Sequence, residues 1–369
     1  MEKIVIYQVF SRLFGNDCRT CEPNGDKATN GCGLMNDFTA RALQQIKSLG
    51  TTHIWYTGLI EHATQSDYTT FGIPLDHPGV VKGKAGSAYA IKDYYDVDPD
   101  LSSSVIARMK EFESLVKRTH KAGLKFIIDF VPNHVAREYK SLCKPKGVKD
   151  LGETDHPEWA FSPLNNFYYI SDQKFAPSFD INGYEEFPAK VTGNDCFSAT
   201  PGRDDWYETV KLNYGVFYQG GGEKQFNPIP DTWKKMLDIL RFWSRKGIDA
   251  FRVDMAEMVP VEFWRWVIPQ VHTFYPKVEF IAECYNPHLY RDYLAAGFEY
   301  LYDKVGMYEY LRGVTSKNWA VEGITQHWQS VADIQDHMLY FLENHDEQRI
   351  ASGFFCGRGM CAQPAMIVA

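Results

Sequence analysis

Three carboxylates each follow an apolar run that is typical of a buried β-strand. Asp254 ends the run GIDAFRVD, Glu283 ends VEFIAE, and Asp346 ends MLYFLENHD. A buried strand places its last side chain at the rim of its sheet. In a parallel barrel these rims meet at one mouth, where such enzymes keep their active sites. Because two carboxylates flanking a glycosidic bond are the usual equipment for cleaving it, the three acids indicate carbohydrate chemistry.

Short β-rich runs alternate with longer amphipathic stretches, which favours βα units and a parallel sheet. Three of the amphipathic stretches predict helices and are followed by a glycine that suits the helix C-terminus. The predicted helices are Phe38–Leu49, Val105–Ala122 and Thr232–Lys246, followed by Gly50, Gly123 and Gly247. The predicted strands are Ile4–Phe10, His53–Gly58, Lys125–Val131, Ile248–Asp254, Glu279–Glu283, Phe298–Tyr302 and Met338–Leu342.

The predicted fold class is α/β, a (β/α)8 TIM barrel with seven strands evident and the eighth missing. A closed barrel of this kind needs one more strand than the pattern supplies. The last residues, PAMIVA, resemble a helix that leads towards an eighth strand. Since an open sheet edge is a liability, we expect the chain to be a fragment of a longer sequence.

One long segment breaks the βα pattern. Residues 135–230 are polar, aromatic and rich in Gly, Asn and Pro, and they hold no long helical pattern. Because a structureless loop of this length is unusual, we expect a small irregular β-rich insertion domain after the third strand. Residues 1–134 would then form the first part of the catalytic barrel, and residues 231–369 its second part, with strands four to seven and the start of the next helix.

Composition bounds the partners of the chain. The length of 369 residues suits one barrel with an insertion. Aromatic residues make up 15% of the chain, which agrees with stacking on sugar rings, although composition alone favours their use in a large core. A net charge of −8 without a long basic run argues against nucleic acid. No apolar stretch is long enough for a bilayer and no signal peptide is evident, so we expect no membrane partner and a cytoplasmic location.

Eight cysteines are scattered along the chain. Cys18 and Cys21 have the spacing of metal ligands, but no second pair with matching spacing follows them. We therefore predict free thiols in a reducing compartment, and a metal site or a disulfide are the alternatives.

Four blocks together carry a family resemblance. Each follows or ends a predicted strand, and the four occur in the family's order. The chain resembles the α-amylase family of glycoside hydrolases along nearly its whole length, and that family has an eightfold βα barrel with an insertion after the third strand. The blocks are DFVPNH at 129–134, GIDAFRVD at 247–254, FIAE at 280–283 and ENHD at 343–346.

The resemblance assigns a catalytic role to each acid. It implies that Asp254 is the nucleophile, which forms a covalent glycosyl-enzyme, and that Glu283 is the general acid and base. A retaining pair has its carboxyl groups about 5–5.5 Å apart. Glu283 must hold a proton at rest, so we expect burial and neighbouring acids to raise its pKa. Asp346 would bind sugar hydroxyls and stabilise the transition state. The alternative for any one acid is a buried structural partner of Arg or Lys.

The resemblance also implies substrate-binding residues. Arg252 should share a strand face with Asp254 and keep it ionised, or form an ion pair of structural value only. His134 and His345 resemble histidines that hydrogen-bond the sugar at the cleavage point. Tyr89 resembles a tyrosine that stacks on the sugar, with core packing as its rival role.

Two further residues, Asp129 and Asn133, resemble a structural pair that orients its neighbours. No organic cofactor is implied. Calcium is left open, with Asn133 as one ligand, because the six to eight oxygens that calcium needs cannot be assembled from the sequence.

Three positions depart from the family pattern. Glu257 and Met258 stand where many α-amylases have Lys and His, which argues against strict α-amylase specificity. Ala90 follows Tyr89 where exo-acting α-glucosidases often carry Asp, which favours an open cleft.

We therefore expect a retaining glycoside hydrolase that cleaves α-glucosidic bonds of a starch-like α-glucan or oligosaccharide substrate. The alternatives are an α-glucan transglycosylase with the same site and a non-catalytic glycan-binding homologue. The sequence leaves the oligomeric state open.

Overall fold

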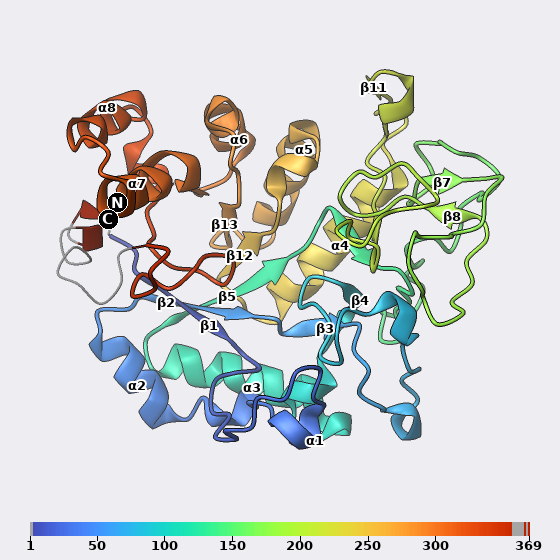
Figure 1. The fold of residues 1–369 in the computed structure, drawn as a ribbon, viewed down its shortest axis with the longest axis horizontal. Helices are drawn as coiled ribbons and strands as arrows, with labels where there is room; N and C mark the ends of the chain where they lie inside the picture. The colour runs from blue at the N-terminus through green and yellow to red at the C-terminus, as the bar shows by residue number, and fades with distance from the viewer. Residues whose placement is uncertain (1–2, 356–364, 367) are drawn as a thin grey trace. The chain divides into compact units, whose positions relative to one another are not determined.

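The computed structural model of the chain describes residues 3–355, 365–366 and 368–369 (Figure 1). It divides into two compact units. The larger unit comprises Ile4–Phe251 and Gln270–Val278, and the smaller one comprises Arg252–Pro269 and the residues from Glu279 onward. Cys356, Cys361 and part of the predicted terminal helix lie outside the described residues.

The larger unit is built on a parallel ladder. Its strands are β1 (Ile6–Phe10), β2 (His53–Thr57) and β5 (Lys125–Phe130), and His53 lies beside Ile6 on one side and Lys125 on the other. Every residue of β2 is buried, as expected of a strand covered on both faces. A fourth strand, β12 (Ala250–Val253), begins in this unit, where the Asp249 N–H donates to the Phe126 carbonyl at 2.8 Å.

Helices α2 (Ala40–Ser48) and α3 (Arg108–Lys121) lie along one side of these strands (Figure 1). The third predicted helix is α4 (Asp231–Arg245), and a short helix, α1 (Lys27–Asn30), precedes them all. The three predicted helix-terminating glycines are confirmed: Gly50, Gly123 and Gly247 have φ of +85°, +74° and +89°, a left-handed conformation that is strained for other residues.

The apolar face of α4 packs into the core of the larger unit. Trp243 is fully buried, and its ring lies edge-on to that of Phe112 in α3, with the centroids 5.2 Å apart. Its indole N–H donates to the Tyr94 carbonyl at 2.7 Å, so the buried ring also satisfies its one polar group.

The segment between β5 and α4 is irregular and β-rich, as predicted. It contains no α-helix between residues 135 and 230, all of which the structure describes. Three short antiparallel pairs lie along it, and the larger unit contains the whole segment, so its status as a separate insertion domain stays a prediction. The pairs are β6 (His134–Ala136) with β9 (Thr209–Lys211), β7 (Tyr169–Ile170) with β8 (Ala189–Lys190), and β10 (Val216–Phe217) with β11 (Glu223–Lys224).

A two-stranded antiparallel sheet after β2 was not predicted. Strands β3 (Ile60–His62) and β4 (Ile91–Val97) pair antiparallel with irregular register. Every residue of β4 is buried. Its sequence IKDYYDV contains three charged residues, a composition that is more typical of a loop than of a buried strand.

The smaller unit has parallel strands of its own. It holds the end of β12 and the strands β13 (Glu279–Ala282), β14 (Tyr300–Tyr302) and β15 (Met338–Leu339). Ile281 lies beside Tyr300, and Leu301 beside Met338, in parallel register. The helices that follow β12, β13 and β14 are α5 (Val261–His272), α6 (Tyr290–Ala296), α7 (Glu309–Lys317) and α8 (Glu322–Ser330).

All seven predicted strands are confirmed, each somewhat shorter than expected. Hydrogen bonds link them in the order β1-β2-β5-β12-β13-β14-β15, which is their order along the chain. Consecutive strands joined by helices in this order are the arrangement of a (β/α)8 barrel, of which seven strands lie in the described residues. Among the described helices, none is both long and apolar enough to cross a bilayer.

Candidate active site

Arg252 lies between the two acids that were predicted to do the chemistry. Its Nη1 donates to Asp254 Oδ1 at 2.9 Å, and its Nη2 forms an ion pair with Glu283 Oε1 at 2.8 Å. Arg252 is 1% exposed and Glu283 3%, so both charges are buried. Asp254 follows the last residue of β12 and Glu283 the last residue of β13, which is why neighbouring strands bring them to one guanidinium.

A third strand end also contacts Arg252. The hydroxyl oxygen of Tyr302, the last residue of β14, accepts from Arg252 Nε at 3.2 Å, and the ring centroid lies 5.5 Å from the guanidinium carbon. Tyr302 was not predicted as a site residue. Its position at the end of a predicted strand, like that of the acids, is the signal that would have found it.

Glu283 is enclosed by hydrogen-bond donors. Its Oε1 accepts from the Tyr285 hydroxyl at 2.5 Å, and its Oε2 accepts from the Met255 N–H at 2.8 Å. Met255 has a φ of +42°, which is uncommon for a residue with a side chain and is characteristic of functional turns. The turn after Asp254 thus directs a backbone dipole at Glu283.

These donors reverse the expected ionisation of Glu283. Burial alone would raise the pKa of this carboxyl, but the charge of Arg252 and the donors of Tyr285 and Met255 outweigh it, and the pKa lies below its usual range. The predicted rise is therefore wrong for this arrangement of the site, because the sequence does not place the two donors. Glu283 is ionised at neutral pH here.

Asp346 and His345 lie in the loop after β15 and interact electrostatically with the same group of charges. Burial and the negative charge of Glu283 raise the pKa of Asp346, while Arg252 and Lys304 oppose the rise. Burial and Arg252 lower the pKa of His345 to about 4, so its imidazole is neutral at neutral pH. The smaller unit therefore brings together the three predicted acids, Arg252 and His345.

The remaining predicted residues lie in the larger unit and form two pairs. The Tyr89 hydroxyl donates to Asp129 Oδ1 at 3.3 Å. The Asn133 side-chain amide lies 3.2 Å from His134 Nδ1, and the buried His134 ring lies against Trp206, with 5.2 Å between the centroids. Asp129 and Asn133 thus each contact another predicted site residue, and their orienting role stays a prediction. Contact of Tyr89, His134 and His345 with a sugar stays a prediction.

The residues around Asn133 do not fit a calcium ion. Asn133 Oδ1, the oxygen that a calcium ion would use, accepts from the Lys211 ammonium at 2.7 Å, and Nδ2 donates to the Gly193 carbonyl at 2.7 Å. The same ammonium lies 2.5 Å from Asp195 Oδ1 and is 2% exposed. A buried cation supplied by the chain already uses the oxygens that a metal would need.

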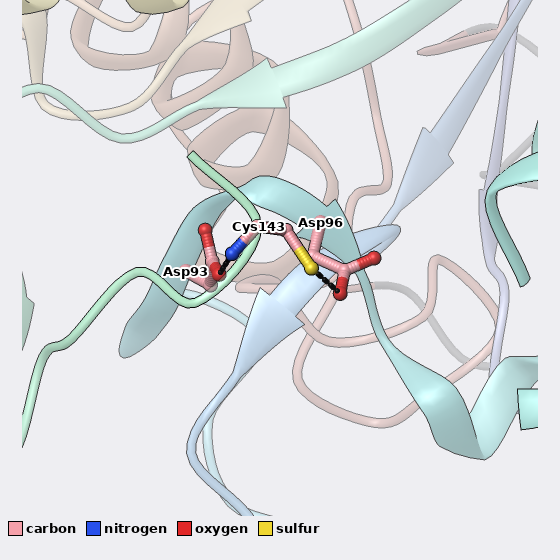
Figure 2. Close-up of side chains that lie close together, drawn as sticks. All are labelled: Asp93, Asp96 and Cys143. Atoms are coloured by element: carbon pink, nitrogen blue, oxygen red, sulfur yellow. Dashed lines mark hydrogen bonds between the residues drawn. The ribbon is translucent and has the colours of Figure 1, made fainter. Parts of the chain in front are cut away.

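Figure 2 shows a second cluster with metal-ligand chemistry, in which ligand atoms of Asp93, Asp96 and Cys143 lie within 4.8 Å of one another. Asp93 Oδ2 accepts from the Cys143 N–H at 2.9 Å, and the thiol lies 2.9 Å from Asp96 Oδ2. Asp96 also pairs with Arg108 through both carboxylate oxygens. Burial and Asp96 raise the pKa of the thiol to about 12, so it stays protonated. The cluster anchors the chain at Cys143 to β4.

The cysteines in the described residues are all free thiols, as expected.

The family model of the alpha amylase catalytic domain matches residues 24–363. This is most of the chain, and the strand order and the charged strand ends agree with it. The chain therefore belongs to the α-amylase family, as a catalytic domain.

The relatives found among known proteins have low sequence identity to this chain, and each is much longer than the region that aligns with it. The chain is 26% identical over 262 residues to an alpha-glucosidase of Apis mellifera, covering 69% of this chain and 35% of that protein. It is 24% identical over 264 residues to a trehalose-6-phosphate hydrolase of Bacillus subtilis (strain 168), covering 70% of this chain and 36% of that protein. The match thus spans about a third of these relatives.

Solved structures share the fold. An alpha-amylase from Lactobacillus plantarum aligns with a TM-score of 0.58 at 23% identity, covering 94% of this chain and 64% of that one. A cyclic alpha-maltosyl-(1→6)-maltose hydrolase from Arthrobacter globiformis, in complex with maltose, aligns with a TM-score of 0.65 at 17% identity, covering 98% and 70%. These likenesses establish the fold of the domain.

The Lys211 contacts predict how the protein responds to calcium. We expect no calcium to bind at the oxygens around Asn133, because the Lys211 ammonium occupies them, so any effect of CaCl2 or EDTA on the melting temperature should be the same in the wild type and in Asp195→Asn. Lys211→Met should lower the melting temperature, since it leaves buried polar groups unpaired. Thermal melts check both. A wild-type protein that calcium stabilises, with the effect lost in Asp195→Asn, would contradict the geometry.

Arg252 should contribute more to the free energy of unfolding at neutral pH than at acid pH. Arg252→Met leaves two buried carboxylates without their cation, so we expect a loss of about 3–5 kcal/mol in unfolding free energy at pH 7. The low pKa of Glu283 contributes stability that is present above its unfolded-state pKa and is lost as pH falls through the folded-state pKa. The deficit of the variant should therefore shrink towards pH 4.

Denaturant unfolding at the two pH values measures this deficit. Arg265→Met is the matched control, since Arg265 forms an exposed pair with Asp292 and should change stability by less than about 0.5 kcal/mol. An equal loss for Arg252→Met at pH 4 and pH 7 would show that packing, and not charge, sets the effect.

Proposed function

We propose that this catalytic domain belongs to a retaining glycosidase that cleaves α-glucosidic bonds in starch-like or maltooligosaccharide substrates. The observation that carries the proposal is the pair Asp254 and Glu283, held by one guanidinium at adjacent strand ends. Relatives named as alpha-glucosidase, maltase and alpha-amylase support the substrate class.

The first step divides the work between the two acids. Asp254, ionised beside Arg252, attacks the anomeric carbon and forms an ester bond, while the bond to the leaving oxygen breaks. Glu283 gives its proton to that oxygen. The positive charge that develops on the sugar ring is offset by the carboxylates of the site, including Asp346.

The second step reverses these roles. Glu283, now ionised, accepts a proton from water, and the oxygen of that water attacks the anomeric carbon and releases Asp254. The neutral His345 can donate or accept a hydrogen bond to a sugar hydroxyl without adding charge to the site. Transfer to a second sugar would use the same intermediate with a sugar hydroxyl in place of water.

The low pKa of Glu283 has a consequence for the first step. The free enzyme carries the required proton on Glu283 mainly at acid pH, so kcat/KM should be highest below neutrality. Substrate that displaces a donor from Glu283 would raise its proton affinity and extend the range.

Incubation with maltoheptaose tests the proposal. We expect the protein to release shorter maltooligosaccharides, resolved by chromatography, and Asp254→Asn to slow this by a factor on the order of 10³ or more, because the nucleophile is lost. Asp292→Asn, on the exposed surface of α6, is the matched control and should keep wild-type turnover.

The products also separate the alternatives. Sugars longer than maltoheptaose would assign transglycosylation in place of hydrolysis. Binding of the sugar without any turnover, in a protein that melts cooperatively, would contradict both reactions and favour a glycan-binding role.

A further inference from the structure

Tyr285 is the nearest hydroxyl donor to Glu283 in the described structure, and the reaction outlined above gives it no role. Its hydroxyl lies 2.5 Å from Glu283 Oε1, the same oxygen that faces Arg252 Nη2 at 2.8 Å. Burial and the charge of Glu283 raise the pKa of Tyr285 far above its usual range, so the phenol keeps its proton and acts as donor. A hydrogen bond to a carboxylate is charge-assisted and favours the ionised form.

The main chain of Tyr285 is fixed by Glu257. Glu257 Oε2 accepts from the Tyr285 N–H at 3.2 Å and from the Asn286 N–H at 2.9 Å. Glu257 lies in the short turn Ala256–Met258 that follows β12, so one carboxylate ties the loop after β13 back to the neighbouring strand end. This gives a structural task to the residue that replaces the family's Lys.

The ring of Tyr285 is held from the other side by Lys304. The ammonium lies 4.6 Å from the ring centroid and forms an ion pair with Glu347 Oε1 at 2.8 Å. Lys304 begins a π-helical turn, Lys304–Tyr308, directly after β14, and such turns are frequent at functional sites. The ring, the main chain and the hydroxyl of Tyr285 are therefore each fixed by a different element.

We propose that Tyr285 is a positioning residue that sets the proton affinity of Glu283, and with it the pH range in which the first step runs. The expected effect on the pH dependence of kcat/KM rests on the proposed function. Removing the hydroxyl takes a donor from the ionised carboxylate, so the pKa of Glu283 should rise. Because a general acid works only while protonated, the alkaline limb of kcat/KM should move to higher pH.

Other charges also face Glu283 and stay in place when the hydroxyl is removed. They are Arg252 from β12 and His345 and Asp346 from the loop after β15. Lys304 and Glu257 contact the ring and the main chain of Tyr285, which Tyr285→Phe retains. A shift caused by Tyr285→Phe alone can therefore be assigned to its hydroxyl.

The test compares pH profiles of kcat/KM for the wild-type protein, Tyr285→Phe and a control, Tyr293→Phe. Tyr293 is a buried tyrosine whose hydroxyl donates to the carbonyls of Ala256 and Val259 at 3.1 and 3.0 Å. We expect the alkaline limb of Tyr285→Phe to move up by about 1 pH unit, and that of Tyr293→Phe to stay at the wild-type pH. A uniform loss of activity without movement of the limb would overturn the proposal.

A second measurement does not depend on turnover. Carbon-13 NMR of protein labelled at the glutamate carboxyls, with the Glu283 signal assigned by Glu283→Gln, gives the titration midpoint directly. We expect a midpoint below the usual glutamate range in the wild type and a higher one in Tyr285→Phe. Equal midpoints would overturn the inference. A shifted midpoint in a protein that turns over no glucan would support the inference and refute the proposed function.

Discussion

The site depends on one buried guanidinium that forms ion pairs with two buried carboxylates. Without Arg252, burying ionised carboxylates at the ends of β12 and β13 would cost several kcal/mol for each unpaired charge. The pairing also sets the orientation of both acids. Since Arg252 stands two residues before Asp254 on the same strand face, the strand itself holds the cation in register with the nucleophile.

The loops beyond the strands adjust the charges that Arg252 brings together. The Met255 N–H and the Tyr285 hydroxyl donate to Glu283 at 2.8 and 2.5 Å, and the Lys304 ammonium lies over the ring of Tyr285. The larger unit also contains a buried cation that contacts two side chains, since the ammonium of Lys211 contacts both Asn133 and Asp195. Interactions between fixed cations and short polar side chains thus organise both units.

Local patterns predicted the strands, the helix-ending glycines and the acids, because apolar runs and single motifs carry that information. The contact of Arg252 with Asp254 followed from their spacing along one strand. The rest depends on pairs that are distant in sequence: Lys211 with Asn133, and β3 with β4, whose charged residues resemble a loop. The pKa of Glu283 was predicted in the wrong direction. Burial of a side chain can be inferred from a sequence, but the positions of the Tyr285 hydroxyl and the Met255 N–H beside Glu283 cannot.

The division of roles between Asp254 and Glu283 is tested most directly by trapping the glycosyl-enzyme. The protein would be treated with a fluorinated α-glucosyl fluoride that reacts at the first step and is released slowly, then digested and sequenced by mass spectrometry. We expect one sugar per chain, attached to the peptide that contains Asp254. A label on Glu283 or Asp346, or turnover of maltoheptaose by a protein that accumulates no label, would contradict the assignment of Asp254 as the nucleophile.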